Sequence, residues 1–245
     1  MLKIVSWLMP ILILLFGFLL MGLSSVASAS GVPEWLVLLP AFLVMNIVAA
    51  YLLKIPHRLW LAWSPLKIYH ILIGIIFGML PVGAAILMAI QDGHSIDISL
   101  DKLALSSLLV TLAIVTWEEL WFRGVALEIG GLRYSSLGSS AIFGVIFLGL
   151  HFLNPEIDLI KHGPELFLAG YTLSACYFVF GSIWAPIGMH FANNVSELIL
   201  KGSGLHPIED HLSVYTIVLA LIAIGFSQVL LKRKSARIFA EFADS

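Results

Sequence analysis

Long runs without a charged residue alternate along this chain with short segments that hold charged and turn-forming residues. The uncharged runs are 4–33, 35–53, 68–91, 103–117, 134–155, 166–196 and 212–231. A helix that crosses a bilayer needs about 20 mainly apolar residues, and a membrane-spanning strand shows an alternation of apolar and polar positions that these runs lack. The pattern therefore predicts membrane-spanning helices and no strands.

Two of the runs do not correspond to one helix each. Run 166–196 is too long for a single span and contains Gly181 and Pro186, which predict a break between two helices. Run 103–117 is short, but apolar residues continue beyond the two glutamates that follow it, toward Gly131. The expected fold is therefore all-α, a polytopic transmembrane bundle of about eight helices.

Composition agrees with this interpretation. Charged residues make up 11% of the 245 residues and hydrophobic residues 60%, and the mean hydropathy is +1.02. An ordinary soluble domain has roughly 25% charged residues to cover its surface. These values exclude a water-soluble enzyme, a disordered protein and a basic nucleic-acid-binding protein. The single cysteine, Cys176, excludes an internal disulfide or thiolate cluster and is expected to serve in packing.

The distribution of Lys and Arg predicts the orientation in the membrane. If the N-terminus is cytoplasmic, nine basic residues fall inside together with Arg123 in the inner half of its helix, which makes ten of the 13. Basic residues concentrate on the cytoplasmic side of membrane proteins, so both termini are expected to be cytoplasmic. The nine are Lys3, Lys54, Arg58, Lys67, Arg133, Lys232, Arg233, Lys234 and Arg237.

The N-terminal segment has two possible interpretations. Lys3, the apolar stretch after it and Ala27-Ser28-Ala29 resemble a cleavable signal peptide. We favour an uncleaved first span, because the apolar run 4–23 is longer than the usual 7–15 residues of a signal-peptide core. Whether residues 1–29 are removed stays open.

Ionisable residues within the predicted spans are functional candidates, because a charged group in hydrocarbon costs several kcal/mol. Glu119 and Arg123 are four residues apart on one helix and are expected to pair. Glu118 points about 100° away from Glu119 and lacks a local partner. An unpaired carboxylate in an apolar site is suited to proton transfer.

Two histidines on other helices complete the candidate site. Phe147 and His151 share one helix face, and His190, Asn194 and Glu197 share another. Glu118 and His151 lie at similar heights, about 20 Å above the cytoplasmic ends of their helices. His190 reaches this level only if the break before its helix lies within the membrane.

These residues predict a polar cavity among the fourth, fifth and seventh helices, open toward the cytoplasmic side. One carboxylate, two imidazoles and a carboxamide can activate a water and stabilise an oxyanion. Two histidines and a carboxylate can also hold a divalent metal, and the candidates for such ligands are His151, His190 and Glu118. Either arrangement would hydrolyse an amide within the membrane.

The ordered set of motifs resembles the CPBP family of CAAX-protease and bacteriocin-processing intramembrane peptidases, also called the Abi family. The family patterns are Glu-Glu-x-x-x-Arg, Phe-x-x-x-His and His-x-x-x-Asn. They are matched here by Glu118, Glu119 and Arg123, by Phe147 and His151, and by His190 and Asn194. The resemblance covers about 103–200. We therefore divide the chain into a first span at 1–33, two helices at 34–102, a catalytic core at 103–200, and a last span with a basic tail at 201–245.

The resemblance implies catalytic roles. Glu118 and His151 would activate the attacking water, and His190 and Asn194 would bind the oxyanion. Glu119 and Arg123 would be a structural pair, with Phe147 in support. The family has been described both as metalloproteases and as metal-free, glutamate-dependent enzymes, so the cofactor stays open, with zinc and no metal as the two candidates. We favour metal-free chemistry, because a site with all three candidate ligands bound to zinc leaves no separate general base.

The implied function is endopeptidase activity on a peptide or membrane-protein substrate in the lipid bilayer. The short loops and the lack of an organelle signal suggest a bacterial cytoplasmic membrane, where prenylated CAAX proteins are generally absent. Two non-enzymatic alternatives stay open. The chain could be a family-like scaffold or bacteriocin-immunity protein, or a small proton-coupled transporter that uses the same buried residues as a proton relay.

Overall fold

The computed structural model describes residues 15–17, 19–20, 22–23, 26–27, 29–52, 65–94, 104–127, 134–152, 158–200 and 211–243. Over these residues the regular structure is entirely helical, and no strand occurs. The predicted all-α class is therefore confirmed. Residues 4–14 and several later positions of the predicted first span at 4–33 lie outside the described residues.

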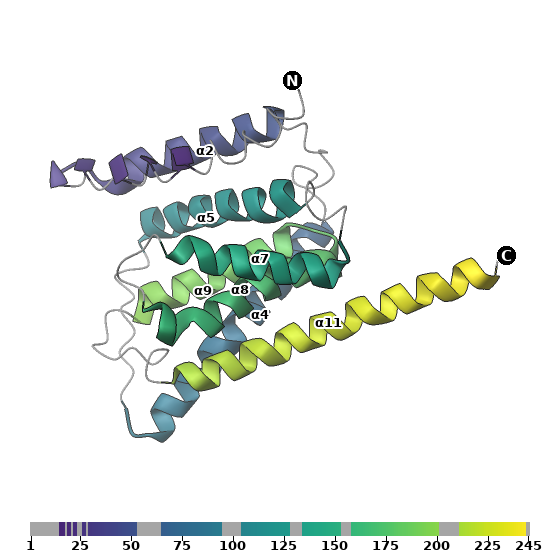
Figure 1. Cartoon of the computed structure of the whole chain (residues 1–245). Coiled ribbons are helices and arrows are strands. Elements are labelled where there is room, and N and C mark those ends of the chain that lie inside the picture. Colours follow the sequence, from purple (N-terminus) through teal and green to yellow (C-terminus); the bar gives the residue numbers. More distant parts are fainter. Residues whose placement is uncertain are drawn as a thin grey trace.

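Eight helical elements follow one another along the described chain (Figure 1). One of them, η2, is a π-helix that continues α5 without interruption. The elements are α2 (Glu34–Leu52), α4 (Pro65–Gln91), α5 (Leu105–Glu119), η2 (Leu120–Ala126), α7 (Ser136–His151), α8 (Leu159–Phe180), α9 (Trp184–Leu200) and α11 (Leu212–Ala243).

Several of these helices suit a membrane. By length and composition, three described segments could cross one, namely Ile68–Gln91, Leu105–Gly124 and Leu212–Arg233. Shorter apolar helices occur at Trp35–Met45 and Ser136–His151. Many large apolar side chains on these helices are exposed, which suits contact with lipid. The chain is thus an integral membrane protein built from apolar helices.

The predicted break in run 166–196 is present. Gly181 ends α8 in the left-handed conformation, with φ of +59°, which glycine adopts at no steric cost. After a short turn, α9 begins at Trp184, and Pro186 stands in its first turn. The amides of a first turn have no helical acceptor, so a proline there costs no hydrogen bond. The break therefore places His190 in the second turn of α9, four residues after Pro186.

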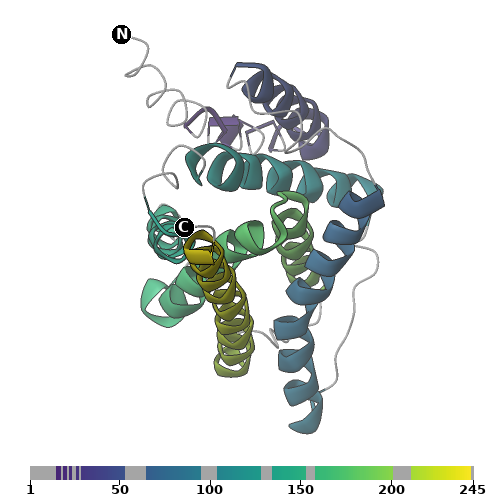
Figure 2. The same ribbon diagram turned by 90° about the vertical axis from the view of Figure 1, so that its right-hand side faces the viewer.

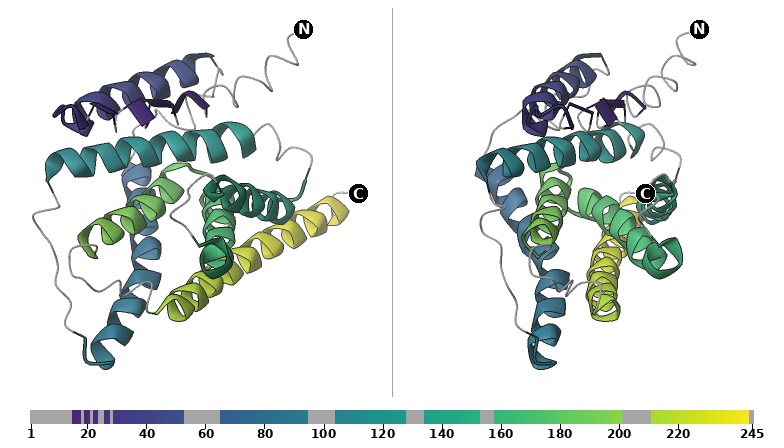
Figure 3. Two further views of the ribbon diagram at one scale, coloured as in Figure 1. Left: turned by 60° about the vertical axis from the view of Figure 1, so that its left-hand side comes forward. Right: turned by 90° about the vertical axis from the view of Figure 1, so that its left-hand side faces the viewer.

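Helix α5 lies between two parts of the fold, with α2 on one side and α9 on the other (Figures 1 and 3). Helix α4 lies beside α9 (Figure 2) and approaches it very closely. A Cβ atom on Gly74 would stand 2.0 Å from the Ala185 carbonyl oxygen, and one on Gly188 would stand 2.2 Å from that of Ile71. Only glycine permits this contact, which holds α9 firmly against α4.

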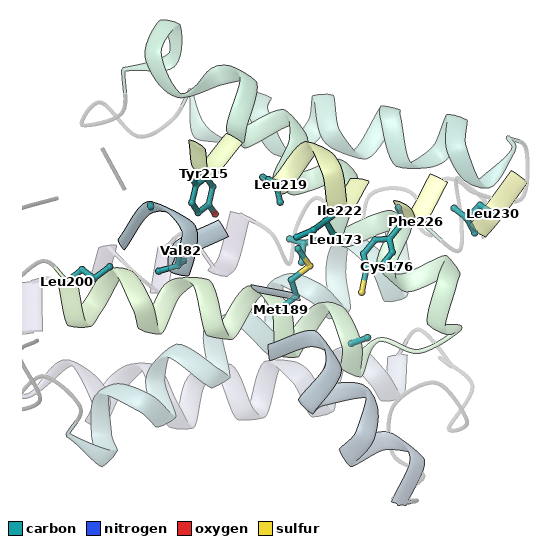
Figure 4. Close-up of a cluster of buried hydrophobic side chains, with 13 residues drawn as sticks. Val82, Leu173, Cys176, Met189, Leu200, Tyr215, Leu219, Ile222, Phe226 and Leu230 are labelled. Atoms are coloured by element: carbon teal, nitrogen blue, oxygen red, sulfur yellow. The ribbon is translucent and has the colours of Figure 1, made fainter. Parts of the chain in front are cut away.

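A buried apolar cluster joins α4, α8, α9 and α11 (Figure 4). Cys176 lies within it and is fully buried, in keeping with the packing role expected for a lone thiol. Helix α11 is tied to α8 at one further point. Arg233 Nη1 donates to the Val179 carbonyl oxygen at 2.7 Å, so a cation caps the C-terminal end of α8.

Candidate active site

The two glutamates lie where α5 passes into the π-helix η2. Glu119 is the last residue of α5, and in η2 the backbone hydrogen bonds reach one residue further, as in the bond from the Leu127 amide to the Phe122 carbonyl oxygen. Short π-helical turns within α-helices occur frequently at functional sites. The sequence predicted that this helix continues past the glutamates, but not that its hydrogen-bond pattern changes there.

Glu119 and Arg123 form a fully buried ion pair. Arg123 Nη1 lies 2.9 Å from Glu119 Oε1, and both side chains have no exposed surface. Arg123 Nη2 also donates to the Gly170 carbonyl oxygen of α8 at 3.2 Å. Its guanidinium lies over the Phe147 ring, 5.8 Å from the centroid. The pair expected from the i,i+4 spacing is therefore present, and it connects η2 to α7 and α8.

The same carboxylate also holds a histidine from a distant helix. His190 Nδ1 on α9 lies 2.8 Å from Glu119 Oε1, although 71 residues separate the two in sequence. A carboxylate paired with a guanidinium is an acceptor, so His190 Nδ1 carries a hydrogen and donates. Sequence reasoning missed this contact, because no local spacing connects α5 with α9.

Glu118 faces the other nitrogen of the same ring. Its Oε2 atom lies 3.5 Å from His190 Nε2. The Glu118 side chain is 27% exposed, whereas that of Glu119 is completely buried. The two adjacent carboxylates therefore lie beside the two ring nitrogens of one imidazole, Glu119 at Nδ1 and Glu118 at Nε2. Glu118 is the carboxylate that a substrate or water can reach.

His151 stands at the last residue of α7, on the other side of Phe147. Its Nδ1 atom lies 2.8 Å from the Phe147 carbonyl oxygen, which can only accept, so Nδ1 carries the hydrogen. The neutral ring then has a lone pair on Nε2. The Phe147 ring lies 4.7 Å from the His151 ring and 6.2 Å from the His190 ring, between centroids. In the described part of the chain, no hydrogen bond joins His151 to Glu118 or His190.

The adjacent amides of α9 have different surroundings. Asn194, which the sequence singled out, is half-buried and has no hydrogen-bonded partner among the residues that the structure describes. Asn193 bonds to Glu197 and to Tyr215 of α11. Asn194 is thus the amide left free one turn beyond His190.

The residues do not form a metal-ligand set. Within the described ranges, no group of three or more His, Cys, Asp and Glu side chains is placed to hold a metal ion. His190 Nδ1 and His151 Nδ1 both carry hydrogens that are already donated, which leaves one nitrogen on each ring. The candidate ligands His151, His190 and Glu118 are near one another in the fold without converging on a common point.

Fold and site together define a membrane-embedded helical protein with a buried carboxylate–imidazole centre. Residues 100–196 match the family model described as type II CAAX prenyl endopeptidase Rce1-like. This segment contains every site residue named above except Glu197 and Tyr215, and the match confirms that this part of the chain resembles the family. The matched segment is thus similar to a family of CAAX-protease-like membrane proteins.

A curated relative matches a shorter part of the chain. It is the uncharacterized protein YyaK of Bacillus subtilis (strain 168), which is 37% identical over 81 residues. The match covers 32% of this chain and 27% of the relative, so the chain spans about a quarter of that protein's length.

Proposed function

We propose that this protein is an intramembrane endopeptidase that hydrolyses a peptide bond with a water activated by Glu118. The observation that carries the proposal is the pair of adjacent glutamates on one imidazole. Glu119 is committed to Arg123 and His190, whereas Glu118 is partly exposed and has no Lys or Arg partner among the described residues. The two acids can therefore perform different tasks at one site.

Glu118 is the general base in this mechanism. It takes a proton from a water, and the water oxygen forms a bond to the carbonyl carbon of the substrate. Glu118 then returns the proton to the amide nitrogen as the carbon–nitrogen bond breaks, which releases an amine and a carboxylic acid. The lone pair on His151 Nε2 accepts a hydrogen bond from the same water and orients it.

His190 and Asn194 are the oxyanion donors. His190 donates from Nδ1 to Glu119, so its second donor atom is Nε2, and this role requires a proton on both nitrogens. The free amide of Asn194 supplies a second N–H. Donors held in place before the reaction stabilise a developing negative charge without the cost of reorganising solvent.

Glu119 has a wider part in this mechanism than a structural ion pair. Its hydrogen bond fixes which nitrogen of His190 points toward Glu118, as a carboxylate does for a catalytic imidazole in other hydrolases. No step of the proposal passes through a metal, because the described residues do not converge as ligands.

The proposed substrate is a peptide or a membrane protein that reaches the site from the bilayer. We place the protein in a bacterial cytoplasmic membrane with a polar cavity open to the cytoplasmic side. The distribution of basic residues supports this orientation.

The test is cleavage of a library of lipidated and unlipidated peptides by the purified protein. Wild type should cleave a subset of the library, and Glu118→Gln should cleave none, because a carboxamide fills the same volume but cannot accept the proton. Equal cleavage by both proteins would refute the assignment of Glu118. A wild-type protein that cleaves nothing would favour a scaffold or an immunity function.

A further inference from the structure

Two adjacent asparagines on α9, Asn193 and Asn194, lie near the face of the helix that carries His190. At 100° per residue, Asn193 and Asn194 lie about 60° and about 40° to either side of His190. Each could turn its amide toward the same site as His190. The difference between them arises from a contact with α11.

Asn193 is held by two hydrogen bonds. Tyr215 of α11 donates its hydroxyl to Asn193 Oδ1 at 2.5 Å, and Asn193 Nδ2 donates to Glu197 Oε1 at 3.3 Å. A carboxylate accepts only, so the NH₂ group must face Glu197 and the amide oxygen must face Tyr215. Both ends of the Asn193 amide are therefore already bonded to other residues.

Tyr215 is well placed to act as an anchor. It is only 7% exposed and belongs to the apolar cluster that joins α11 to α4, α8 and α9 (Figure 4). A buried hydroxyl that lost its acceptor would be left without a hydrogen bond among apolar side chains, so the bond to Asn193 is strongly favoured. Tyr215 also lies outside residues 100–196, the segment that matches the family.

We infer that Tyr215 and Asn193 are positioning residues that set the rotation of α9 and thereby keep the Asn194 amide free to donate into the site. The inference rests on the proposed hydrolysis. The Glu119–His190 bond restrains α9 on one side and the Tyr215–Asn193 bond restrains it on another. With both in place, the helix cannot turn about its own axis without breaking one of them.

A small rotation is enough to matter. A side-chain atom about 5 Å from the helix axis moves by nearly 1 Å when the helix turns by about 10°. A misplacement of about 1 Å can reduce the rate of an enzymatic reaction by as much as 100-fold. Loss of the Tyr215 hydroxyl should therefore lower turnover although Tyr215 takes no part in the proposed chemical steps.

The experiment compares Tyr215→Phe with a matched control, Tyr171→Phe. Tyr171 of α8 also makes a hydrogen bond to α11, 2.7 Å from its hydroxyl to Ser227 Oγ, but among the described residues its hydroxyl makes no hydrogen bond to α9. Tyr215→Phe should lower kcat by about 10-fold with KM changed by less than about twofold, because only the alignment of the transition state suffers. Tyr171→Phe should leave both parameters near those of wild type.

A second measurement is independent of hydrolysis. Asn194→Cys places a thiol on α9, and Cys176, the natural cysteine, is fully buried and gives little background. Addition of Tyr215→Phe should change the rate of labelling at position 194 by a water-soluble maleimide by at least about threefold, since thiol reactivity depends on surroundings. Addition of Tyr171→Phe should not change that rate.

Each outcome decides the inference. A lower kcat together with altered labelling, both absent in Tyr171→Phe, supports it. An unchanged kcat, or a lower kcat with unchanged labelling, overturns it. If wild type cleaves no peptide, the proposed function fails, and the positioning of α9 is then tested by the labelling alone. Equal labelling rates of Asn194→Cys with and without Tyr215→Phe would contradict the inference.

Discussion

Glu118 and Glu119 are neighbours in the sequence, but their surroundings differ sharply. Glu119 accepts hydrogen bonds from Arg123 and His190 with no exposed surface, and Glu118 is partly open and approaches His190 only on its outer edge. The sequence alone indicated a structural role for Glu119. The bond to His190 adds a catalytic consequence, because the orientation of that ring depends on it.

Substitution of each glutamate by glutamine should separate these roles. Glu118→Gln should abolish cleavage and leave the melting temperature near that of wild type. Glu119→Gln should lower activity as well and should reduce the free energy of unfolding by about 3 kcal/mol, because Arg123 stays buried without its charged partner. Thermal unfolding in detergent and peptide cleavage measure the two effects. A Glu119→Gln protein as stable as wild type would contradict this account.

The expectation for a metal follows from the site residues, which within the described ranges form no group of three His, Cys, Asp or Glu ligands. Each ring has one nitrogen that already donates, His190 to Glu119 and His151 to the Phe147 carbonyl. We predict that exhaustive chelation leaves kcat within about twofold of the untreated value, because a hydrolytic zinc normally has three protein ligands and an open position. Elemental analysis of the purified protein accompanies the assay. Stoichiometric zinc whose removal and return switch activity off and on would reverse the prediction and make both histidines ligands.

Packing between α7 and α8 controls the position of Phe147 and of the histidines beside it. Gly170 of α8 lies against α7 so closely that a Cβ atom there would stand 2.5 Å from Phe147 Cβ. The carbonyl oxygen of the same glycine accepts from Arg123 and from Ser174. Gly170 thus permits two contacts with site residues, the close packing against Phe147 and the hydrogen bond from Arg123.

Gly170→Ala should therefore disturb both the helix pair and catalysis. Forcing a methyl group into a filled space typically costs about 1–3 kcal/mol, and displacement of Phe147 would shift the rings that it separates. Gly149→Ala on α7 is the matched control, because nothing lies within 4 Å of a Cβ at that position and helix propensity favours alanine by up to about 1 kcal/mol. Thermal unfolding and cleavage of both variants are compared. Equal stability of the two proteins would contradict this prediction, because it would mean that α7 and α8 can move apart to admit a methyl group at position 170 without cost.

At the level of the whole molecule, the orientation in the membrane decides from which side a substrate reaches the site. Helices α5 and α8 begin at the ends that the charge pattern assigns to the outer side, and α11 begins there and ends in the basic segment. We predict that both termini are cytoplasmic, because ten of the 13 basic residues then lie on the inner side.

Reporter fusions after each helix test this orientation. A fusion to the C-terminal end of α11 should report a cytoplasmic location, and a fusion in the loop 201–211 should report the outer side. A cytoplasmic signal from the loop and an outer signal from the C-terminus would invert the topology. That result would also favour removal of the first span, since one span fewer reverses the relation between the two ends.

Local sequence determined much of the architecture. The helices formed where uncharged apolar runs predicted them, because a chain in lipid must satisfy its backbone hydrogen bonds within each segment. The end of α8 at Gly181 and the start of α9 followed from residues whose backbone preferences act locally. The Glu119–Arg123 pair required only two residues four positions apart on one helix.

The contacts between helices were decided by the tertiary structure alone. The Glu119–His190 bond, the Tyr215–Asn193 bond and the close approach of α4 to α9 join segments with no fixed spacing in sequence. Their geometry depends on helix rotation and crossing, which result from the packing of all side chains at once. The sequence could therefore name Glu118, His151, His190 and Asn194 as candidates. Only the packed bundle bonds Asn193 to Tyr215 and gives Glu119 its second partner.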